Sequence, residues 1–310
     1  MHEHIARTMY YFSVHLVFAS MVGCAAWGLT STRGASATTK YWIWVVTAFN
    51  FIVPSGALID RLWAPHLTWA RPLGIIGDPI WVMTEGRTAV VLAVLWIAGT
   101  LLMLMRLVSR MGRERHEAQA RASLGEPRVT SNFVADGIPV SFGNGNRSPA
   151  VCGVLYPRIL LPIGIDRLLN QREFNAVLMH ELAHARRRDN LIRLFYEVLL
   201  CALWFHPLLW LAGARIALYR ELSCDESVIR HSHGQALVSA LAKLAVPQKA
   251  ELLEATASSH LTHRLARLAA PAHTTQRAAN LLLISLFTAV IAAGIFQTIA
   301  HTACCFLLKH

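Results

Sequence analysis

The chain has 310 residues, of which 55% are hydrophobic and only 15% are charged. A soluble domain carries about 25% charged residues, so this composition favours a protein that sits in lipid and rules out a disordered or collagen-like chain. The net charge of +11 comes from 29 Lys and Arg against 18 Asp and Glu. Most of this excess lies beside apolar runs, which is typical of the cytoplasmic face of a membrane protein rather than of direct nucleic-acid binding.

Four apolar runs are long enough to cross about 30 Å of hydrocarbon as helices, which takes roughly 20 residues. They cover residues 9–30, 41–59, 88–105 and 281–300. The first run could belong to a signal peptide, because residues 35–37 are typical of a cleavage site, but its apolar core exceeds the usual length of roughly 7 to 15 residues. We therefore expect four retained transmembrane helices.

Charges between these runs predict the orientation of the chain. The loop 31–40 holds Arg33 and Lys40 without an acidic residue, and the segment 106–280 opens with a series of arginines. Positively charged segments next to a membrane helix stay in the cytoplasm. We therefore expect both segments on the cytoplasmic side, both termini on the opposite side, and the lipid bilayer as a partner.

The expected spans divide the chain into three parts. Residues 1–108 form a membrane domain with three transmembrane helices, residues 109–280 form a cytoplasmic domain, and residues 281–310 supply the fourth helix and a short tail. In the cytoplasmic domain, residues 106–125 predict a basic helical stalk that leads into it. The β-branched runs at 128–134, 138–142 and 151–161 then predict a small sheet.

A helix predicted from Gln171 to about Arg188 carries the chemistry. Asn170 and Glu173 form a plausible capping box at its start. The motif H-E-x-x-H follows at residues 180–184, and its two histidines, four residues apart, project from one face and can hold a single Zn²⁺. Glu181 lies too close to His180 to bind the same ion comfortably, but it is well placed to act as general base on a water at the zinc.

A catalytic zinc commonly takes a third protein ligand. The downstream candidates are Asp189, Glu197, His206, Glu221, Asp225 and Glu226. Glu221 and Asp225 share one helical face, so we predict Glu221 as the ligand and Asp225 as the carboxylate that orients a ligand histidine. Two other interpretations stay open: a solvated acidic surface that pairs with Arg220 or Arg230, and a zinc thiolate or a buried structural thiol at Cys224.

The apolar segment 191–218 lies between the histidines and Glu221. A single crossing would place the two halves of the metal site on opposite membrane faces, about 30 Å apart, so the segment must turn back. Pro207 cannot continue a helical hydrogen-bond ladder, which places the break at residues 205–207. We therefore predict a membrane-associated helical hairpin at 191–218.

These motifs together resemble the BlaR/MecR family of integral-membrane zinc metallopeptidases, the antirepressor sensor-proteases of β-lactam resistance. The matching residues are Ser148-Pro149, Gly153, Pro157 to Pro162, the H-E-x-x-H with Arg187-Arg188-Asp189, Trp204-Phe205-His206-Pro207 with Trp210, and Glu221-Leu222-Ser223-Cys224-Asp225. The resemblance implies a mainly α membrane protein of the bacterial inner membrane. A cytoplasmic α+β zincin-like (gluzincin) domain would lie between its third and fourth transmembrane helices.

The resemblance also implies a function. His180, His184 and Glu221 look like zinc ligands and Glu181 like the catalytic base of an endopeptidase that cleaves a cytoplasmic winged-helix repressor. Because residues 301–310 are short and no S-x-x-K motif is present, we expect a member without the C-terminal penicillin-binding sensor domain. No direct contact with nucleic acid is expected, and formation of a homodimer is left open.

Two rival functions share parts of this pattern. A housekeeping membrane protease of the CAAX or heat-shock type also has an H-E-x-x-H and a later E-x-x-x-D. A non-catalytic receptor could keep zinc structurally, although it would need no Glu181. For the protease, substrate pairing is expected along the sheet edge at 151–155. Arg187, His206 and Tyr219 are candidates for a second oxyanion donor, but a structural role is favoured for each of them.

Overall fold

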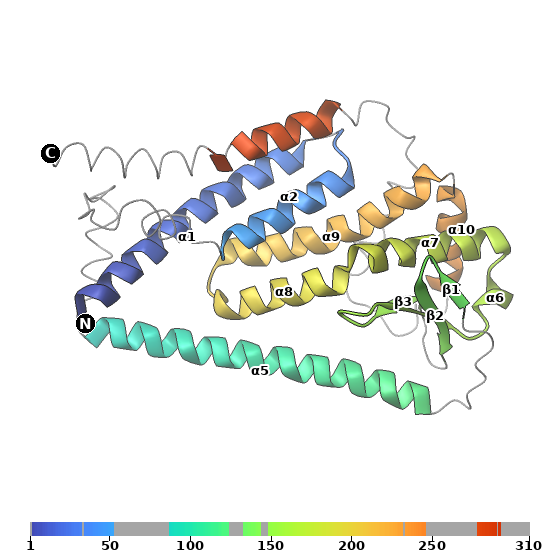
Figure 1. Ribbon diagram of the computed structural model, residues 1–310, viewed down its shortest axis with the longest axis horizontal. Coiled ribbons are helices and arrows are strands. Elements are labelled where there is room, and N and C mark those ends of the chain that lie inside the picture. Colours follow the sequence, from blue (N-terminus) through green and yellow to red (C-terminus); the bar gives the residue numbers. More distant parts are fainter. Residues whose placement is uncertain are drawn as a thin grey trace.

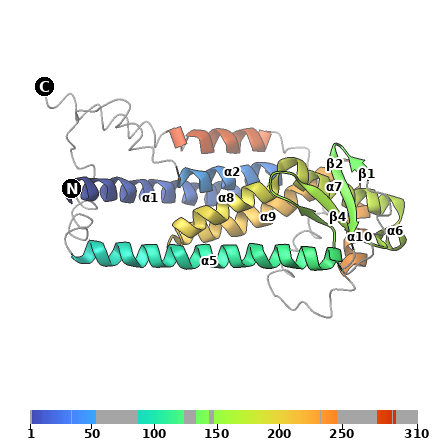
Figure 2. The ribbon, with the colours of Figure 1, turned by 60° about the horizontal axis from the view of Figure 1, so that its bottom comes forward.

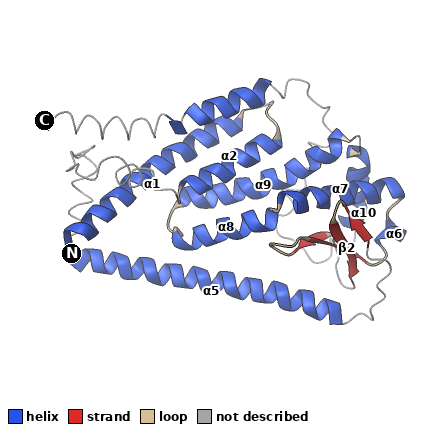
Figure 3. Cartoon of the chain, in the orientation of Figure 1, coloured by secondary structure: helices blue, strands red, loops and turns tan. Residues whose placement is uncertain are grey.

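The computed structural model describes residues 2–32, 34–52, 87–123, 133–143, 148–231, 233–245, 278–289 and 291–292. Within these ranges the chain is mostly helical, with one small sheet at one end of the molecule (Figure 1, Figure 3). Most of the helices run roughly along the length of the molecule, and the sheet lies at the end away from the N-terminus (Figure 1). A mainly helical protein is therefore confirmed.

Two N-terminal helices form a hairpin. α1 spans His2–Ser31 and α2 spans Ala37–Asn50, which starts after Ser36 because the Ser36 side chain accepts a hydrogen bond from the backbone N–H of Thr39. Residues 41–50 of the run predicted at 41–59 are helical, but the helix ends at Asn50, where the chain enters a turn. Residues 53–59 of that run lie outside the described residues.

A single long helix, α5 (Arg87–Ser123), joins the run predicted at 88–105 to the predicted basic stalk. The expected domain boundary after residue 108 therefore falls inside an unbroken helix. Within the described part of the chain, Val90–Arg113 is the one helical stretch long and apolar enough to cross a membrane, and His15–Ser31 and Ala278–Ala289 are shorter apolar helices. The side chains of Leu101 and Met105 are each 61% exposed, so much of the apolar surface of α5 faces away from the protein.

The segment predicted to form a hairpin does so. α8 (Asp189–Ala202) and α9 (Pro207–Arg230) are separate helices, and Pro207 is the first residue of α9, as its fixed φ and missing N–H favour. The two helices approach closely at Gly213, where a Cβ would lie 2.1 Å from the hydroxyl of Tyr196. The predicted break in the helix is confirmed, and contact of this hairpin with a membrane stays a prediction.

The sheet has the strand order β1-β2-β4-β3. Its strands are β1 (Phe133–Ala135), β2 (Ile138–Gly143), β3 (Ala150–Cys152) and β4 (Arg158–Pro162), with β2 and β4 parallel and the outer pairs antiparallel. The single run predicted at 151–161 is therefore wrong, because it folds into two strands. Gly153 makes the turn between them with φ +88°, and a Cβ there would meet the carbonyl oxygen of Tyr156 at 2.3 Å. This turn leaves β3 at the sheet edge.

Two hydrophobic cores share helix α9. One core packs α1, α2, α8 and the N-terminal part of α9 around the fully buried Trp44 and Leu209. The other packs the sheet against α6 (Ile165–Leu168), α7 (Gln171–Arg187), α10 (Gly234–Ala245) and the C-terminal part of α9. The lengthwise run of α9 from the helical bundle to the sheet end is visible in Figure 2. Residues near Glu221 therefore lie where the two cores meet.

Candidate metal centre

Helix α7 presents the two histidines of the H-E-x-x-H motif. The predicted capping box is confirmed, since the side chain of Asn170 accepts from the N–H of Glu173 and the Glu173 carboxylate accepts from the N–H of Asn170. This fixes the first turn of the helix. His180 and His184 then lie one turn apart, with their rings 4.8 Å apart between centroids and their Nε2 atoms 3.1 Å apart. Both Nε2 atoms therefore converge on one point.

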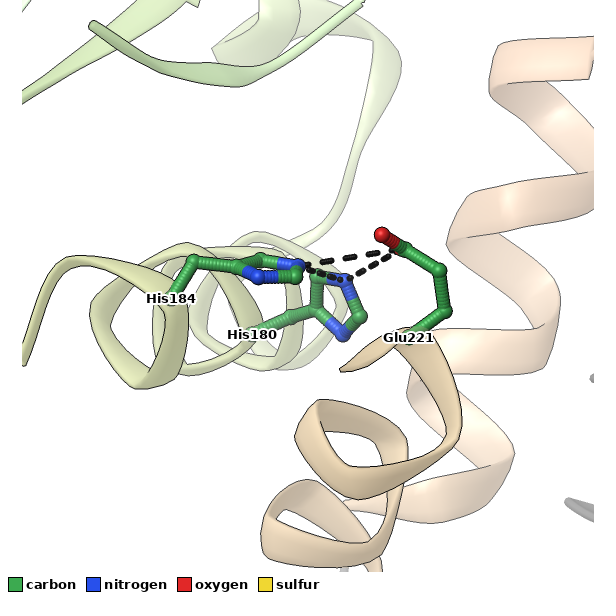
Figure 4. Close-up of side chains that lie close together, drawn as sticks. All are labelled: His180, His184 and Glu221. Atoms are coloured by element: carbon green, nitrogen blue, oxygen red, sulfur yellow. Dashed lines mark hydrogen bonds and ion pairs between the residues drawn. The ribbon is translucent and has the colours of Figure 1, made fainter. Parts of the chain in front are cut away.

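Glu221 completes this cluster from α9. Its Oε2 lies 3.7 Å from Nε2 of His180 and 3.7 Å from Nε2 of His184, and the three side chains point toward one another (Figure 4). All three donor atoms lie within 4.8 Å of one another. The structure thus brings together two predicted histidines and a carboxylate separated from them by about forty residues of chain. Two imidazoles and a carboxylate are a donor set that suits catalytic Zn²⁺.

The Nδ1 atom of each imidazole faces a further carboxylate. Asp225 Oδ1 lies 3.0 Å from Nδ1 of His180, which is the orienting position predicted for this residue. Asp189 Oδ2 lies 2.7 Å from Nδ1 of His184. With each Nδ1 turned to a carboxylate, each Nε2 is left for the metal. Asp189 is only a ligand candidate in the sequence, although its place just after the histidine helix could have indicated this orienting role.

Arg187 holds Asp189 in place. Its guanidinium donates to both carboxylate oxygens of Asp189, Nε at 2.6 Å and Nη2 at 2.6 Å, and also contacts Ser223 and Cys224. His184, Asp189 and Cys224 also have donor atoms close enough to hold a metal ion. Because the guanidinium already bonds to two of these three residues, this second cluster is an internal ion-pair network. Cys224 is fully buried, in agreement with its interpretation as a structural thiol.

The charges of the site favour a cation. Burial lowers the pKa of His180, but the carboxylates of Asp225 and Glu221 raise it by more, to about 9. Burial also opposes charge on His184, while hydrogen bonding to Asp189 raises its pKa well above the usual value. Burial raises the pKa of Glu221, but hydrogen bonds from the two imidazoles hold it well below its ordinary range. The donors together therefore stabilise positive charge in their midst.

Glu181 lies next to His180 on α7 and is half-buried. Burial raises the pKa of the Cys152 thiol on β3, and the nearby charge of Glu181 raises it further. The edge strand of the sheet and the predicted base therefore lie in the same region. Asn190 fixes this strand by donating to the carbonyl oxygens of Val151 and Gly153, at 2.9 and 3.0 Å.

Several other predicted candidates lie elsewhere or have different partners. Glu197 pairs with Arg193 and Arg110, and the Glu226 carboxylate accepts from the backbone at the start of α2. His206 is the N-cap residue of α9 and contacts Ser20. The Tyr219 hydroxyl donates to the carbonyl oxygen of Thr30. The three candidate oxyanion donors thus have other partners. Arg187 bonds Asp189, His206 contacts Ser20, and Tyr219 bonds the backbone of Thr30.

A helix-borne histidine pair, a distant carboxylate and an adjacent glutamate define the class of metal-dependent hydrolases. Comparison with known proteins points to a peptidase family. The model of the BlaR1 peptidase M56 family matches residues 12–268, which is most of the chain. The chain belongs to the BlaR1 peptidase M56 family. This membership confirms the resemblance found in the sequence and does not favour the housekeeping alternative.

Curated relatives match shorter stretches. The regulatory protein BlaR1 of Bacillus licheniformis is 38% identical over 84 residues, which is 27% of this chain and 14% of BlaR1. The methicillin resistance mecR1 protein of Staphylococcus aureus is 28% identical over 105 residues, which is 33% of this chain and 18% of that relative. The mecR1 protein of Staphylococcus epidermidis matches to the same extent. The chain thus matches less than a fifth of the length of these relatives.

Proposed function

We propose that this chain is a membrane-bound zinc endopeptidase that cleaves a cytoplasmic winged-helix repressor in a signalling pathway similar to that of antibiotic resistance. The observation that carries the proposal is the convergence of His180, His184 and Glu221 beside Glu181 in a chain of a peptidase family. The regulatory and resistance roles in the names of its relatives support a signalling function.

The donor set fits zinc. His180, His184 and Glu221 would hold the ion, and the carboxylates behind the imidazoles favour the tautomers that leave both Nε2 atoms for binding. Bound there, zinc would supply a Lewis acid that polarises the scissile carbonyl and promotes ionisation of the attacking water.

The residues around the site supply the remaining chemistry. Glu181 accepts the proton from the attacking water at its carboxylate and donates it to the leaving amide nitrogen. Strand β3 (Ala150–Cys152) lies at the sheet edge in the region of Glu181, so an extended substrate can pair with its backbone there. Asp225 and Asp189 keep the two imidazoles oriented during turnover.

The same proposal includes a membrane topology. Residues 1–108 and 281–310 would cross the bacterial inner membrane four times, and a gluzincin-like domain at 109–280 would lie in the cytoplasm with both termini outside. The exposed apolar surface of α5 supports contact with lipid. The start of α2 contacts α9 two residues from Glu221, through Thr38 and Ser223, which supports a placement of the loop 31–40 and the metal site on the same side of the membrane.

Substitution of the predicted base tests the enzyme. We expect Glu181→Gln to keep its zinc, measured by atomic emission on detergent-purified protein, and to cleave quenched peptide libraries about 10²- to 10⁴-fold more slowly. Mass spectrometry of new protein N-termini in cells should find a cleaved DNA-binding repressor with the wild type and not with Glu181→Gln.

Two further variants make this test decisive. Glu221→Gln should lose zinc, whereas Asp166→Asn, which changes an exposed carboxylate on α6, should leave both zinc and cleavage unchanged. Undiminished cleavage by Glu181→Gln would overturn the proposed catalytic base, and unchanged signalling by this variant without cleavage would favour a receptor. Wild-type zinc affinity in Glu221→Gln would overturn the proposed ligand set.

A further inference from the structure

Helix α2 reaches the metal centre through one side chain. Tyr41 is fully buried, and its hydroxyl donates to Oδ1 of Asp189 at 3.1 Å. The other oxygen of the same carboxylate, Oδ2, lies 2.7 Å from Nδ1 of His184. A continuous series of hydrogen bonds therefore runs from α2, in the N-terminal bundle, to a proposed zinc ligand on α7.

Tyr41 touches both partners of the ion pair behind His184. The guanidinium of Arg187 lies over the Tyr41 ring at 4.2 Å from the centroid, within the range of a cation–π interaction. The same guanidinium bonds both oxygens of Asp189. Arg187 and Tyr41 both donate to Oδ1, so removal of the hydroxyl takes one donor from the oxygen that does not face His184. The carboxylate plane would then be less firmly fixed.

The start of α2 is also fixed to the other side of the site. The carboxylate of Glu226 accepts from the backbone N–H groups of Ala37 and Thr38, each at 3.3 Å. The hydroxyl of Thr38 lies 3.1 Å from that of Ser223. Glu226 and Ser223 are the near neighbours of Asp225 on α9. The backbone next to Tyr41 is therefore held in place by α9, so the Tyr41 hydroxyl can hold Asp189 in a fixed position.

We propose that Tyr41 is a positioning residue of the metal centre, whose hydroxyl fixes Asp189 and thereby the orientation of His184. The inference rests on the metal site of the proposed function and adds a residue outside the motif-bearing helices to it. Through this contact, the placement of α2 sets how well His184 binds the metal.

Substitution of Tyr41 by phenylalanine tests this inference. Tyr41→Phe keeps the ring over Arg187 and removes only the hydroxyl. Because outer partners of metal ligands contribute to affinity, we expect zinc to bind about tenfold more weakly in competition with a chromophoric chelator. The visible absorption bands of the Co²⁺-loaded protein should shift, and kcat should fall while KM stays unchanged. The thermal midpoint of zinc-free protein should stay near that of the wild type.

Tyr219→Phe is the matched control. It removes another buried tyrosine hydroxyl, which joins α9 to the backbone of Thr30 on α1 and makes no hydrogen bond to the metal site within the described residues. Its zinc affinity and Co²⁺ spectrum should equal those of the wild type. Wild-type affinity and spectrum in Tyr41→Phe, or an equal loss in Tyr219→Phe, would overturn the inference alone. Failure of the wild type to bind zinc would overturn the proposed function as well.

Discussion

At the residue scale, the orientation of each imidazole decides the chemistry. A histidine has two ring nitrogens, and a carboxylate hydrogen-bonded to one of them leaves the other for a metal. Asp189 makes such a hydrogen bond with Nδ1 of His184 at 2.7 Å, and Asp225 faces Nδ1 of His180 as an ion-pair partner at 3.0 Å. The resulting pair of Nε2 atoms faces Glu221 rather than solvent or the helix backbone. Side chains that bind no metal therefore decide whether the motif can bind one.

Glu173 gives a prediction at the same scale, on the acid side of the pH range. Hydrogen bonds from Lys243, Ser239 and the backbone of Asn170 lower its pKa from 4.5 to about 2. A carboxylate with a lowered pKa stabilises the fold above its ordinary pKa, and this stabilisation disappears as the pH falls toward the lowered value. We therefore expect the difference in melting temperature between wild type and Glu173→Gln to be largest above pH 4.5 and to shrink toward about pH 2.

Lys243→Met supplies the companion measurement. The hydrogen bond from Lys243 makes the strongest contribution to the lowered pKa of Glu173. In Lys243→Met the pKa of Glu173 should therefore lie closer to its ordinary value. The stabilisation by the Glu173 carboxylate should then disappear over a narrower range of pH than in the wild type. Intrinsic tryptophan fluorescence in detergent would follow both melting curves. A wild-type advantage over Glu173→Gln that stayed constant from pH 6 to pH 3 would contradict the assignment.

At the element scale, close approach between helices depends on missing side chains. A Cβ at Gly99 of α5 would lie 2.2 Å from the indole of Trp204, at the bend between α8 and α9. The indole N–H of Trp96 donates to the carbonyl oxygen of Ala202 at 2.7 Å in the same contact. The bend of the hairpin is thus fixed against the long helix, which places α8 and, through it, the start of the network around Asp189.

Gly99→Ala should therefore destabilise the protein. Forcing a methyl group into this contact must displace a bulky, hydrogen-bonded ring, at a cost of about 1–3 kcal/mol in the free energy of unfolding. Gly112→Ala is the control on the same helix, because a Cβ there meets nothing within 4 Å. It should instead stabilise by roughly 0.5–1 kcal/mol through helix propensity alone. Equal and positive changes in melting temperature for both variants would refute the close packing of α5 against Trp204.

At the scale of the whole molecule, α9 joins two different environments. Its N-terminal part packs within the helical bundle and its C-terminal part packs against the sheet domain, with Glu221 between them. The metal centre consequently lies at the junction of the two cores rather than inside one domain. This placement is why α2, far from the motif in the sequence, can contact Asp189.

Chemical labelling can test the proposed orientation of this assembly in the membrane. The Tyr156 side chain in the turn between β3 and β4 is 84% exposed, so Tyr156→Cys in a cysteine-free background gives a reactive reporter beside the sheet. A membrane-impermeant maleimide should label it in inverted vesicles and not in spheroplasts. A cysteine at the N-terminus, His2→Cys, should be labelled in spheroplasts and not in inverted vesicles. Labelling of both positions from one side would contradict the proposed topology.

The sequence by itself determined the local features. Helical spacing placed His180 and His184 on one face, the capping box at Asn170 set where that helix begins, and Pro207 set where the hairpin breaks, because each depends on residues within a few positions of one another. Membership of the peptidase family followed from the same motifs.

Only the tertiary structure decided which distant groups meet. It joined Glu221 to the histidine pair, turned Asp189 from a ligand candidate into the partner of His184, and brought Tyr41 to it across 148 positions of sequence. It also divided the run 151–161 into two strands at Gly153. The physical reason is that these contacts depend on how helices pack through the two shared cores, and side-chain packing between remote segments leaves no fixed spacing in the sequence.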